Sequence, residues 1–311
     1  MKIISFNIDV DPLINYYSIH GLGSHDTFPD PVYECGIKRF LELFDRYGIK
    51  ATFFITAGGL NGAVPGILRN IAEKGHEIGN HSYSHDYRLT LMNDDEIFED
   101  IRKNHEAIKD LTGFECLGFR SPGYNSSGAI ISALKKMSYS YDSSLFPSFS
   151  YYLAKWLLIN LKMLAGRRSR SVISSFLDAF GFYKPEFIDE NIKDVKKTGA
   201  LVEIPITTLF PPAGIPLIGT SLICFPKWLI NLMLKSSLKR DIVNIEFHGI
   251  DLVEVNDSDN LEPLKSMQPD LKYDLAHKLQ RFEQVIRFYT ENGYRFMTLS
   301  EIADMKKRFE L

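Results

Sequence analysis

The chain begins with the stretch Lys2-Ile3-Ile4-Ser5-Phe6-Asn7-Ile8-Asp9-Val10-Asp11-Pro12, an apolar run of strand character that ends in two carboxylates. Side chains alternate between the two faces of a strand, so Asp9 and Asp11 can point to the same side. Two like charges this close repel each other unless a cation lies between them, or unless one binds a cation and the other takes up protons. The alternative is a surface turn, in which both carboxylates solvate the strand end before Pro12.

Length and charge limit the class of protein. At 311 residues the chain can form one large α/β domain with a substantial core, and we expect a single domain over residues 1–311. The formal net charge is -3 with both signs interspersed, so nucleic acid is not an expected partner. A run of about 18 apolar residues, long enough to span a bilayer, is absent, and the first residues do not resemble a secretory signal. We therefore expect a cytoplasmic protein.

Strand and helix patterns alternate along the rest of the chain. A loop is expected at residues 12–33, and the apolar spacing predicts helices at 36–47, 64–74, 94–111, 130–137 and 272–292. Strands are predicted at residues 51–55, 76–81, 116–120, 139–142, 201–206, 242–248 and 294–298. This alternation predicts a parallel sheet, and about seven or eight such units predict a (β/α) barrel. In barrels the chemistry gathers at the carboxyl ends of the strands, where this chain has Asp9, Asp11, His81, Arg120, Asp142 and His248.

Two histidines stand four residues apart in the stretch His81-Ser82-Tyr83-Ser84-His85. On a helical turn both imidazoles would face the same direction and could bind one metal ion together with a carboxylate. Three protein ligands with open positions are typical of a hydrolytic rather than a structural site. The alternative is a pair of surface histidines in a polar loop.

Five motifs in order give the chain a resemblance to a known family. They are Asp9–Asp11, Asn80–His85, Phe119–Tyr124, Tyr141–Ser144 and Glu246–His248. In this order and spacing they resemble the polysaccharide deacetylases of the NodB-homology type, carbohydrate esterase family four. The resemblance covers most of the chain and implies a distorted (β/α) barrel of about seven strands. It also implies metal-dependent removal of acyl groups from amino sugars.

The resemblance implies a metal site and a base. By position, Asp11, His81 and His85 would bind one divalent metal ion, and Asp9 would be the general base. Zinc is the ion we expect first, and iron, cobalt and manganese also suit two imidazoles and a carboxylate.

The resemblance also implies supporting roles. Arg120 would steady Asp9, and the backbone N–H near Gly123 would contribute to an oxyanion hole. His248 would be the general acid, and Asp142 would tune it. The alternatives are a structural ion pair for Arg120 and a core histidine for His248. An ion pair at the barrel mouth explains the charged strand residues Glu203 and Glu246 as well as catalysis does.

Two departures from the family pattern concern the substrate. Many members have adjacent aspartates followed by glycine, whereas Val10 separates Asp9 from Asp11 here and Pro12 follows. This D-x-D form resembles a branch of peptidoglycan-deacetylase-like proteins and of deformylases that act on a polyprenyl-phosphate-linked sugar. Gly123 stands where many members place an aromatic residue, so the pocket wall is either more open there or supplied by Tyr124.

Two apolar stretches combine a tryptophan with basic residues. The first, at 149–166, holds Trp156 and is followed by Arg167, Arg168 and Arg170, within an insertion at about residues 148–195. The second, at 225–235, holds Trp228. Such a pattern is typical of an interfacial helix, and the alternative is a barrel helix packed on the core. We prefer the barrel helix for the second stretch and leave both interpretations open for the first.

The sequence therefore predicts a hydrolase that removes an acetyl or formyl group from an amino-sugar or glycan substrate, with a polyprenyl-linked sugar as one form of it. The protein would be cytoplasmic, with peripheral contact to the inner face of the membrane. One alternative keeps the fold and hydrolyses a non-peptide C–N bond in a small cyclic amide or ureide. A second is a non-catalytic barrel that binds glycan or lipid. The oligomeric state does not follow from the sequence.

Overall fold

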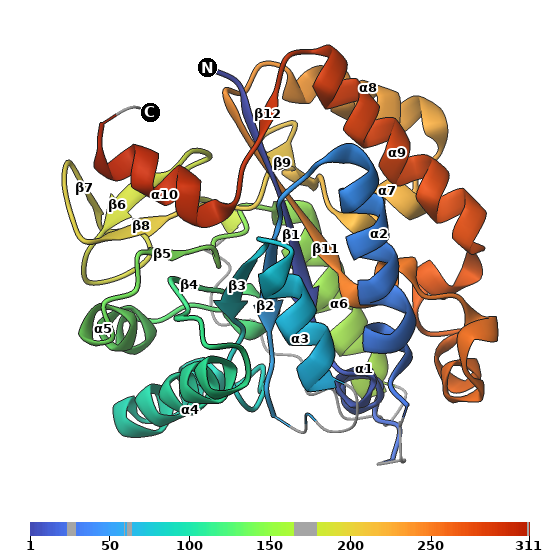
Figure 1. Cartoon of the computed structure of the whole chain (residues 1–311), viewed down its shortest axis with the longest axis horizontal. Coiled ribbons are helices and arrows are strands. Elements are labelled where there is room, and N and C mark those ends of the chain that lie inside the picture. The colour runs from blue at the N-terminus through green and yellow to red at the C-terminus, as the bar shows by residue number, and fades with distance from the viewer. Residues whose placement is uncertain (24–28, 59, 61–63, 165–178, 310) are drawn as a thin grey trace.

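The computed structural model describes residues 1–23, 29–58, 60, 64–164, 179–309 and 311. Its centre is a curved sheet whose parallel strands follow the order β11-β1-β2-β3-β4-β5-β8, with helices packed around the outside (Figure 1). These strands are β11 (Ile242–His248), β1 (Ile3–Val10), β2 (Thr52–Ile55), β3 (Glu77–Asn80), β4 (Gly118–Phe119), β5 (Tyr141–Asp142) and β8 (Leu201–Glu203). The predicted distorted (β/α) barrel is confirmed.

The sheet closes between the end of β8 and β11. Past β8, the N–H of Thr207 donates to the carbonyl of Asn244 at 2.9 Å. A few residues later, Ile218 forms a parallel bridge with Glu246. These contacts replace a regular ladder, so the barrel is closed by an irregular seam on this side.

Strand β1 pairs with three other strands of the barrel. It pairs with β11 on one side and with β2 on the other, and β12 (Arg295–Phe296) pairs with its beginning. All eight of its residues are buried, as expected for a parallel strand covered on both faces. The register places Asp9 beside His248 of β11. Polar residues at the ends of β1 and β11 therefore meet at one rim of the barrel.

The helices predicted from apolar periodicity are present. They are α2 (Lys38–Tyr47), α3 (Val64–Glu73), α4 (Asp94–Thr112), α5 (Gly128–Lys136) and α9 (Leu275–Glu291). Helix α4 begins with a capping box between Asn93 and Glu96 and ends at Gly113, whose φ is 79°. Each of these helices buries one apolar face against the sheet. Its apolar residues therefore recur at helical spacing, and this spacing predicted the helix from the sequence.

The remaining elements are short or lie outside the simple alternation. The helices are α1 (Leu13–His20), α6 (Phe149–Leu164), α7 (Gly219–Cys224), α8 (Lys227–Ser237) and α10 (Leu299–Lys307), with a π-helical segment at Val32–Ile37. Strands β6 (Glu186–Ile188) and β7 (Val195–Lys196) extend the sheet in antiparallel fashion, and β9 (Thr208–Leu209) pairs with β10 (Ile215–Pro216). Short 3-10 helices lie at Leu89–Leu91, Pro122–Tyr124, Gly249–Leu252, Val255–Asp257, Asp259–Leu264 and Pro269–Lys272.

The predicted loop at residues 12–33 is wrong at Leu13–His20, where α1 lies, and at its end, where the π-helical segment begins. Leu13, Tyr16 and Tyr17 recur at helical spacing and are buried, so tertiary packing stabilises a helix there. The insertion predicted at about 148–195 contains α6 and β6. Its arginines Arg167, Arg168 and Arg170 lie outside the described residues.

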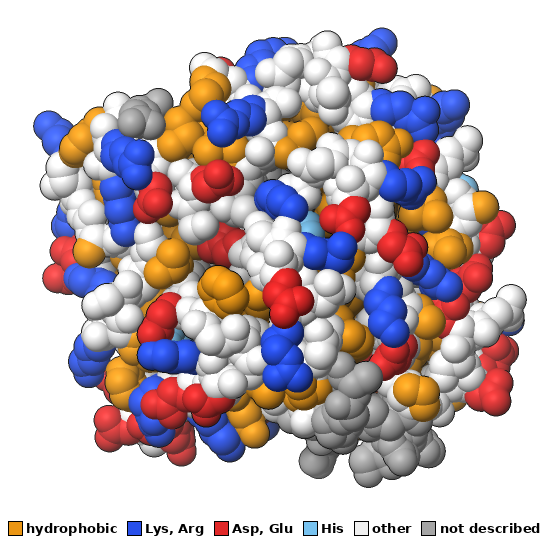
Figure 2. Space-filling model, in the orientation of Figure 1, with side chains coloured by type: hydrophobic (Ala, Val, Ile, Leu, Met, Phe, Trp, Pro, Cys, Tyr) orange, Lys and Arg blue, Asp and Glu red, His pale blue; other side chains and the backbone are white. Residues whose placement is uncertain are grey.

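The sequence predicts a surface with interspersed charges of both signs and no helix that spans a membrane. On the face that Figure 2 presents, basic and acidic side chains are interspersed and apolar side chains lie scattered between them. Within the described part of the chain, none of the helices combines the length and the apolar character needed to cross a bilayer.

Candidate metal centre and active site

Six residues of the predicted site line one cavity of about 550 Å³ at the carboxyl ends of the barrel strands. They are Asp9, Asp11, His81, His85, Gly123 and His248. Arg120 lies directly behind Asp9, with its side chain fully buried. The cavity wall is completed mainly by aromatic and apolar residues, which include Tyr87, Tyr124, Tyr151, Ala154, Ile218 and Phe225.

Asp11, His81 and His85 form a compact ligand set. The Oδ1 atom of Asp11 lies 2.8 Å from Nε2 of His85 and 3.5 Å from Nε2 of His81. Two ligand atoms at zinc-like distances in tetrahedral geometry are about 3.4 Å apart, so this spacing fits one shared ion. The three residues are buried, and one atom from each lies within 4.8 Å of the others.

The protonation of this ligand set also suits a metal ion. His81 Nδ1 lies 2.8 Å from the carbonyl oxygen of Arg120 and must donate to it, which leaves the lone pair on Nε2. Burial lowers the pKa of His81, and a neutral imidazole is the form that binds metal. Burial alone would raise the pKa of Asp11, but His85 and His81 hold it well below its ordinary value. The residues present therefore fit a divalent ion.

The two histidines are brought together by a loop and not by a helical turn. Ser82 and His85 both have positive φ, at 63° and 49°. Asn80 Oδ1 accepts the N–H of Ser82, and Ser82 Oγ accepts the N–H of His85. Asp100 on α4 accepts two further backbone N–H groups of this loop. The pair does not lie on a helical turn, yet the two imidazoles lie together, edge to face, with ring centroids 4.9 Å apart.

Asp9 and Arg120 form a fully buried ion pair. Nη1 of Arg120 donates to Asp9 Oδ1 at 2.8 Å, and the same guanidinium donates to Asn7 and to the carbonyl and hydroxyl of Ser143. Burial raises the pKa of Asp9 even though Arg120 and His81 act in the opposite direction. The pKa values of Asp9 and Asp11 are therefore shifted in opposite directions, although only Val10 separates the two residues.

His248 pairs with Glu246, the residue two positions before it on β11. Nδ1 of His248 lies 2.9 Å from Glu246 Oε1. Burial alone would lower the pKa of His248, but the Glu246 carboxylate, with Asp9 and Asp11, raises it well above its ordinary value. The charge of His248 in turn lowers the pKa of Glu246 against the effect of its burial.

The contacts of Asp142 do not support its predicted role in tuning His248. Asp142 lies in register with Glu203 of β8. Burial raises the pKa of Asp142 to about 6, although hydrogen bonds with Ser144 and Glu203 act in the opposite direction. Its carboxylate accepts the hydroxyl of Ser144 at 2.6 Å, and Ser144 Oγ accepts the N–H of Ser121 at 2.9 Å. Asp142 therefore supports the loop that holds Gly123. The acid paired with His248 is Glu246, which the sequence left open between an ion pair and catalysis.

Gly123 adopts a left-handed conformation with φ of 63° and leaves room for an aromatic ring from elsewhere. A Cβ atom at this position would lie 2.2 Å from Cδ1 of Tyr87. The pocket wall that many family members build here is thus supplied by Tyr87, together with the predicted Tyr124. Tyr87 was missed in the sequence, although it follows His85 by only two positions.

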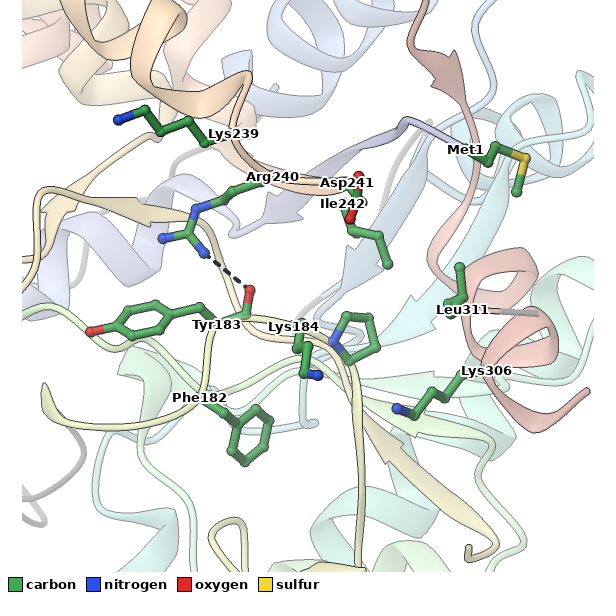
Figure 3. Close-up of a pocket in the computed structure, with 11 residues that line it drawn as sticks. Met1, Phe182, Tyr183, Lys184, Lys239, Arg240, Asp241, Ile242, Lys306 and Leu311 are labelled. Carbon is green, nitrogen blue, oxygen red and sulfur yellow. Dashed lines mark hydrogen bonds between the residues drawn. The ribbon is translucent and has the colours of Figure 1, made fainter. Parts of the chain in front are cut away.

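A second cavity, of about 650 Å³, lies near the amino ends of β1 and β11 (Figure 3). The cationic side chains of Lys184, Lys239, Arg240 and Lys306 line it. Among the described residues in its wall, Asp241 is the only acidic side chain, and none is a histidine. It contains none of the predicted site residues, so the catalytic constellation belongs to the first cavity alone.

Comparisons with known proteins find similarity to polysaccharide deacetylases. Residues 25–141 match the family model for polysaccharide deacetylase. The chain is 30% identical over 150 residues to the peptidoglycan deacetylase of Helicobacter pylori. This aligned region covers 46% of this chain and 49% of that protein. It is 36% identical over 84 residues to the peptidoglycan-N-acetylglucosamine deacetylase of Bacillus cereus, in an alignment that covers 27% of this chain and 30% of that protein. The chain thus spans about half or less of the length of these curated relatives.

One solved structure extends the similarity over the whole fold. It comes from Mycobacterium smegmatis and is assigned to the polysaccharide deacetylases, with a TM-score of 0.60 and 18% sequence identity. The superposition covers 99% of this chain and 91% of that chain. The shared fold therefore includes β1 and β11, which lie outside the residues matched by the family model.

We expect His81→Ala to lose stoichiometric divalent metal, because the substitution removes one of three ligands. Metal analysis of the purified chain measures this. His105→Ala is the matched control, since His105 contacts Tyr139 and Glu115 outside the cavity. The control should keep one ion per chain. Full metal content in His81→Ala would show that the ligand assignment is wrong.

Proposed function

We propose that the chain, which matches the polysaccharide deacetylase family model over residues 25–141, is a metal-dependent hydrolase that removes an N-acyl group, acetyl or formyl, from an amino sugar. One observation carries this proposal. The three potential metal ligands, the Asp9–Arg120 pair and the Glu246–His248 pair meet at one cavity. Such a set supplies a place for a metal ion, a base and an acid, which amide hydrolysis requires.

Asp11, His81 and His85 would hold the metal ion. A divalent ion in such a site lowers the pKa of bound water towards neutrality and polarises a carbonyl group. Zinc, iron, cobalt and manganese all suit this ligand set, and zinc is the ion we propose first.

Asp9 would accept the proton of the attacking water. Its Oδ1 atom is fixed by Arg120, and Oδ2 lies 3.8 Å from His81 Nε2, on the side of the metal ligands. Because burial raises its pKa, Asp9 holds a proton better than an exposed aspartate does. A base of this kind matches the task of removing a proton from an acidified water.

His248 would protonate the leaving amine. Its pairing with Glu246 keeps the imidazole protonated to a higher pH than is usual for histidine. Its side chain is 26% exposed and lines the cavity. When the C–N bond breaks, the proton moves from His248 to the amine nitrogen, which leaves as a neutral or ammonium group. The acyl group leaves as acetate or formate.

The backbone N–H near Gly123 would stabilise the oxyanion of the tetrahedral intermediate. The chain of hydrogen bonds from Asp142 through Ser144 to Ser121 supports this role, because it holds the loop two residues before Gly123. We therefore propose that Asp142 acts as a positioning residue for this loop.

The size and lining of the cavity favour a sugar over a small cyclic amide. A volume of about 550 Å³ with aromatic walls accommodates at least one sugar unit, whereas a small ureide would fill a narrower site. Hydrolysis of a cyclic amide or ureide remains the first alternative. A glycan-binding or lipid-binding barrel without catalysis is the second, and a complete acid and base set argues against it.

The helix α6 supports a lipid-linked form of the substrate. Ser150, Tyr151 and Ala154 of this helix line the cavity. Large apolar side chains of the same helix are exposed at 38% or more, namely Phe149, Leu153, Trp156, Leu157, Leu158, Leu161 and Met163. We propose that this surface rests on the inner face of a membrane and brings a polyprenyl-linked sugar to the cavity.

The second apolar stretch behaves differently. In α8, Ile230, Met233 and Leu234 are buried in the core, while Trp228 remains 66% exposed. One apolar face thus packs on the barrel, in agreement with the preferred interpretation of this stretch as a barrel helix.

The metal-loaded chain should release acetate or formate from a panel of N-acylated amino sugars and their oligomers. Asp9→Asn should reduce this release by a factor of about 10² to 10⁴, because the base is lost. Asp110→Asn, an exposed aspartate on α4, is the control and should be as active as the unchanged chain. Turnover of a cyclic ureide alone would favour the first alternative, and glycan binding without any turnover would favour the second.

Glu246→Gln should move the alkaline limb of the kcat–pH profile to lower pH by about one unit or more. Without the carboxylate, His248 loses its proton at lower pH and can no longer serve as the acid. Glu203→Gln is the control, because Glu203 is a buried acid that pairs with Asp142 and not with His248. An alkaline limb unchanged by Glu246→Gln would rule out His248 as the acid.

The chain should float with vesicles of anionic phospholipid, and Trp156→Glu should weaken this association several-fold, since it places a charge in the apolar surface of α6. Trp228→Glu on α8 is the matched control and should leave flotation unchanged. A chain that never floats, or that floats equally well with Trp156→Glu, contradicts the proposed membrane contact.

A further inference from the structure

Lys155 is a buried cation beside the active-site cavity. It lies on α6 and is 9% exposed. Its Nζ atom is 3.4 Å from the carbonyl oxygen of Gly123 and 5.7 Å from the ring centroids of both Tyr87 and Tyr151. These three residues line the cavity, as does Ala154, the neighbour of Lys155 in the helix. The ammonium group therefore lies directly behind residues that form the cavity wall.

Lys155 differs from the other deeply buried cations of the described chain in having no carboxylate partner. Arg120 pairs with Asp9, and Lys278 lies in the field of Asp270 and Asp251. For Lys155, burial alone is the cause that lowers its pKa, to about 8, and no described carboxylate offsets it. A carbonyl dipole and two aromatic faces compensate a buried ammonium group only in part.

The other charges around the cavity show what the charge of Lys155 can do for a substrate. Asp9 and Asp11 are acidic and line the end of the cavity formed by β1 and β11, and the acid Glu246 pairs with His248, which lines the same end. Arg120, a protonated His248 and a bound divalent ion would balance these acids, so the charge of Lys155 is left for an anionic group of the substrate. Lys155 holds this charge next to the Gly123 loop, which is proposed to contact the acyl group.

We propose that Lys155 forms an anion-binding subsite and that the substrate carries an anionic group close to its N-acylated amino sugar. This inference rests on the proposed function and specifies the substrate class within it. The anionic group is either the phosphate of a phosphorylated or lipid-phosphate-linked sugar or the carboxylate of an acidic amino sugar. Lys155 recognises either through its charge, and the tyrosine rings hold the ammonium group in place.

A purely structural role for Lys155 gives a different expectation. The contact with Gly123 joins α6 to the loop of the proposed oxyanion hole, and loss of this contact would impair every substrate alike. An anion subsite instead predicts a selective loss. The ratio of activities on anionic and neutral substrates therefore separates the two roles.

The experiment compares three N-acetylated sugars with the metal-loaded full chain: N-acetylglucosamine 1-phosphate, N-acetylmuramic acid and methyl N-acetylglucosaminide. We expect kcat/KM of the unchanged chain to be higher for one of the two anionic sugars than for the neutral one. Lys155→Met, which keeps the apolar stem, should lower kcat/KM for that anionic sugar by about tenfold or more and for the neutral sugar less than about twofold. Preference for the phosphate or for the carboxylate identifies the source of the anion.

Lys103→Met is the matched control. Lys103 also lies over a tyrosine ring, with Nζ 3.8 Å from the centroid of Tyr83, but it is exposed on α4 and outside the cavity. It removes the same net charge and should leave the ratio between anionic and neutral sugars unchanged. A selective loss with Lys155→Met alone therefore reports the position of the charge.

Binding measurements separate this inference from the proposed function. Calorimetric titration of metal-loaded Asp9→Asn, with and without Lys155→Met, compares affinities without turnover. If no sugar is hydrolysed but Lys155→Met selectively weakens binding of the anionic sugar, the proposed function fails and the subsite stands. If the unchanged chain shows no preference for an anion, or Lys155→Met affects all three sugars equally, the subsite is wrong.

Discussion

The buried ion pair between Asp9 and Arg120 is the interaction on which the rest of the site depends. Both side chains are removed from water, so each must find its partners inside the barrel. Arg120 meets this requirement by bonding to β1 and to the segment after β5 at the same time. Removal of one partner from such a pair costs about 3–5 kcal/mol. The guanidinium thus fixes the position of Asp9 and couples the carboxyl ends of these strands.

Around this pair, neighbouring charges give similar groups different proton affinities. Asp9 and Asp11 are two residues apart on one strand, yet the pKa of Asp9 is raised by burial and that of Asp11 is held low by the imidazoles. His81 is driven towards its neutral form, whereas His248 is kept protonated by Glu246. A ligand needs a lone pair, and an acid needs a proton. The environment of each group, and not its residue type, therefore supports its proposed role.

The sequence predicted the barrel and the residues at its rim because both follow from local patterns. Apolar periodicity gave the helices, and the motifs gave the acids and histidines at the strand ends. What it could not give depends on register between distant strands. Asp142 lies beside Glu203 because β5 pairs with β8, whereas Glu246 reaches His248 because residues two apart on β11 share a face. The helix α1 was overlooked for another reason, since Pro12 and a glycine-rich stretch obscured the helical spacing of Leu13, Tyr16 and Tyr17.

Helix α6 links the cavity to the surface because its two sides have different neighbours. Tyr151 and Lys155 are four residues apart, so they share the side that faces the cavity. Trp156, Leu157 and Leu161 are exposed on the remaining surface of the helix. A helix is about 10 Å across, so a lipid surface in contact with the apolar side would lie about that far from the cavity wall. A sugar joined to lipid through a phosphate would then place its anionic group near Lys155 and its acyl group deeper in the cavity. The exposed apolar side of α6 and Lys155, a buried cation to which the described residues offer no carboxylate, thus support the same proposed substrate.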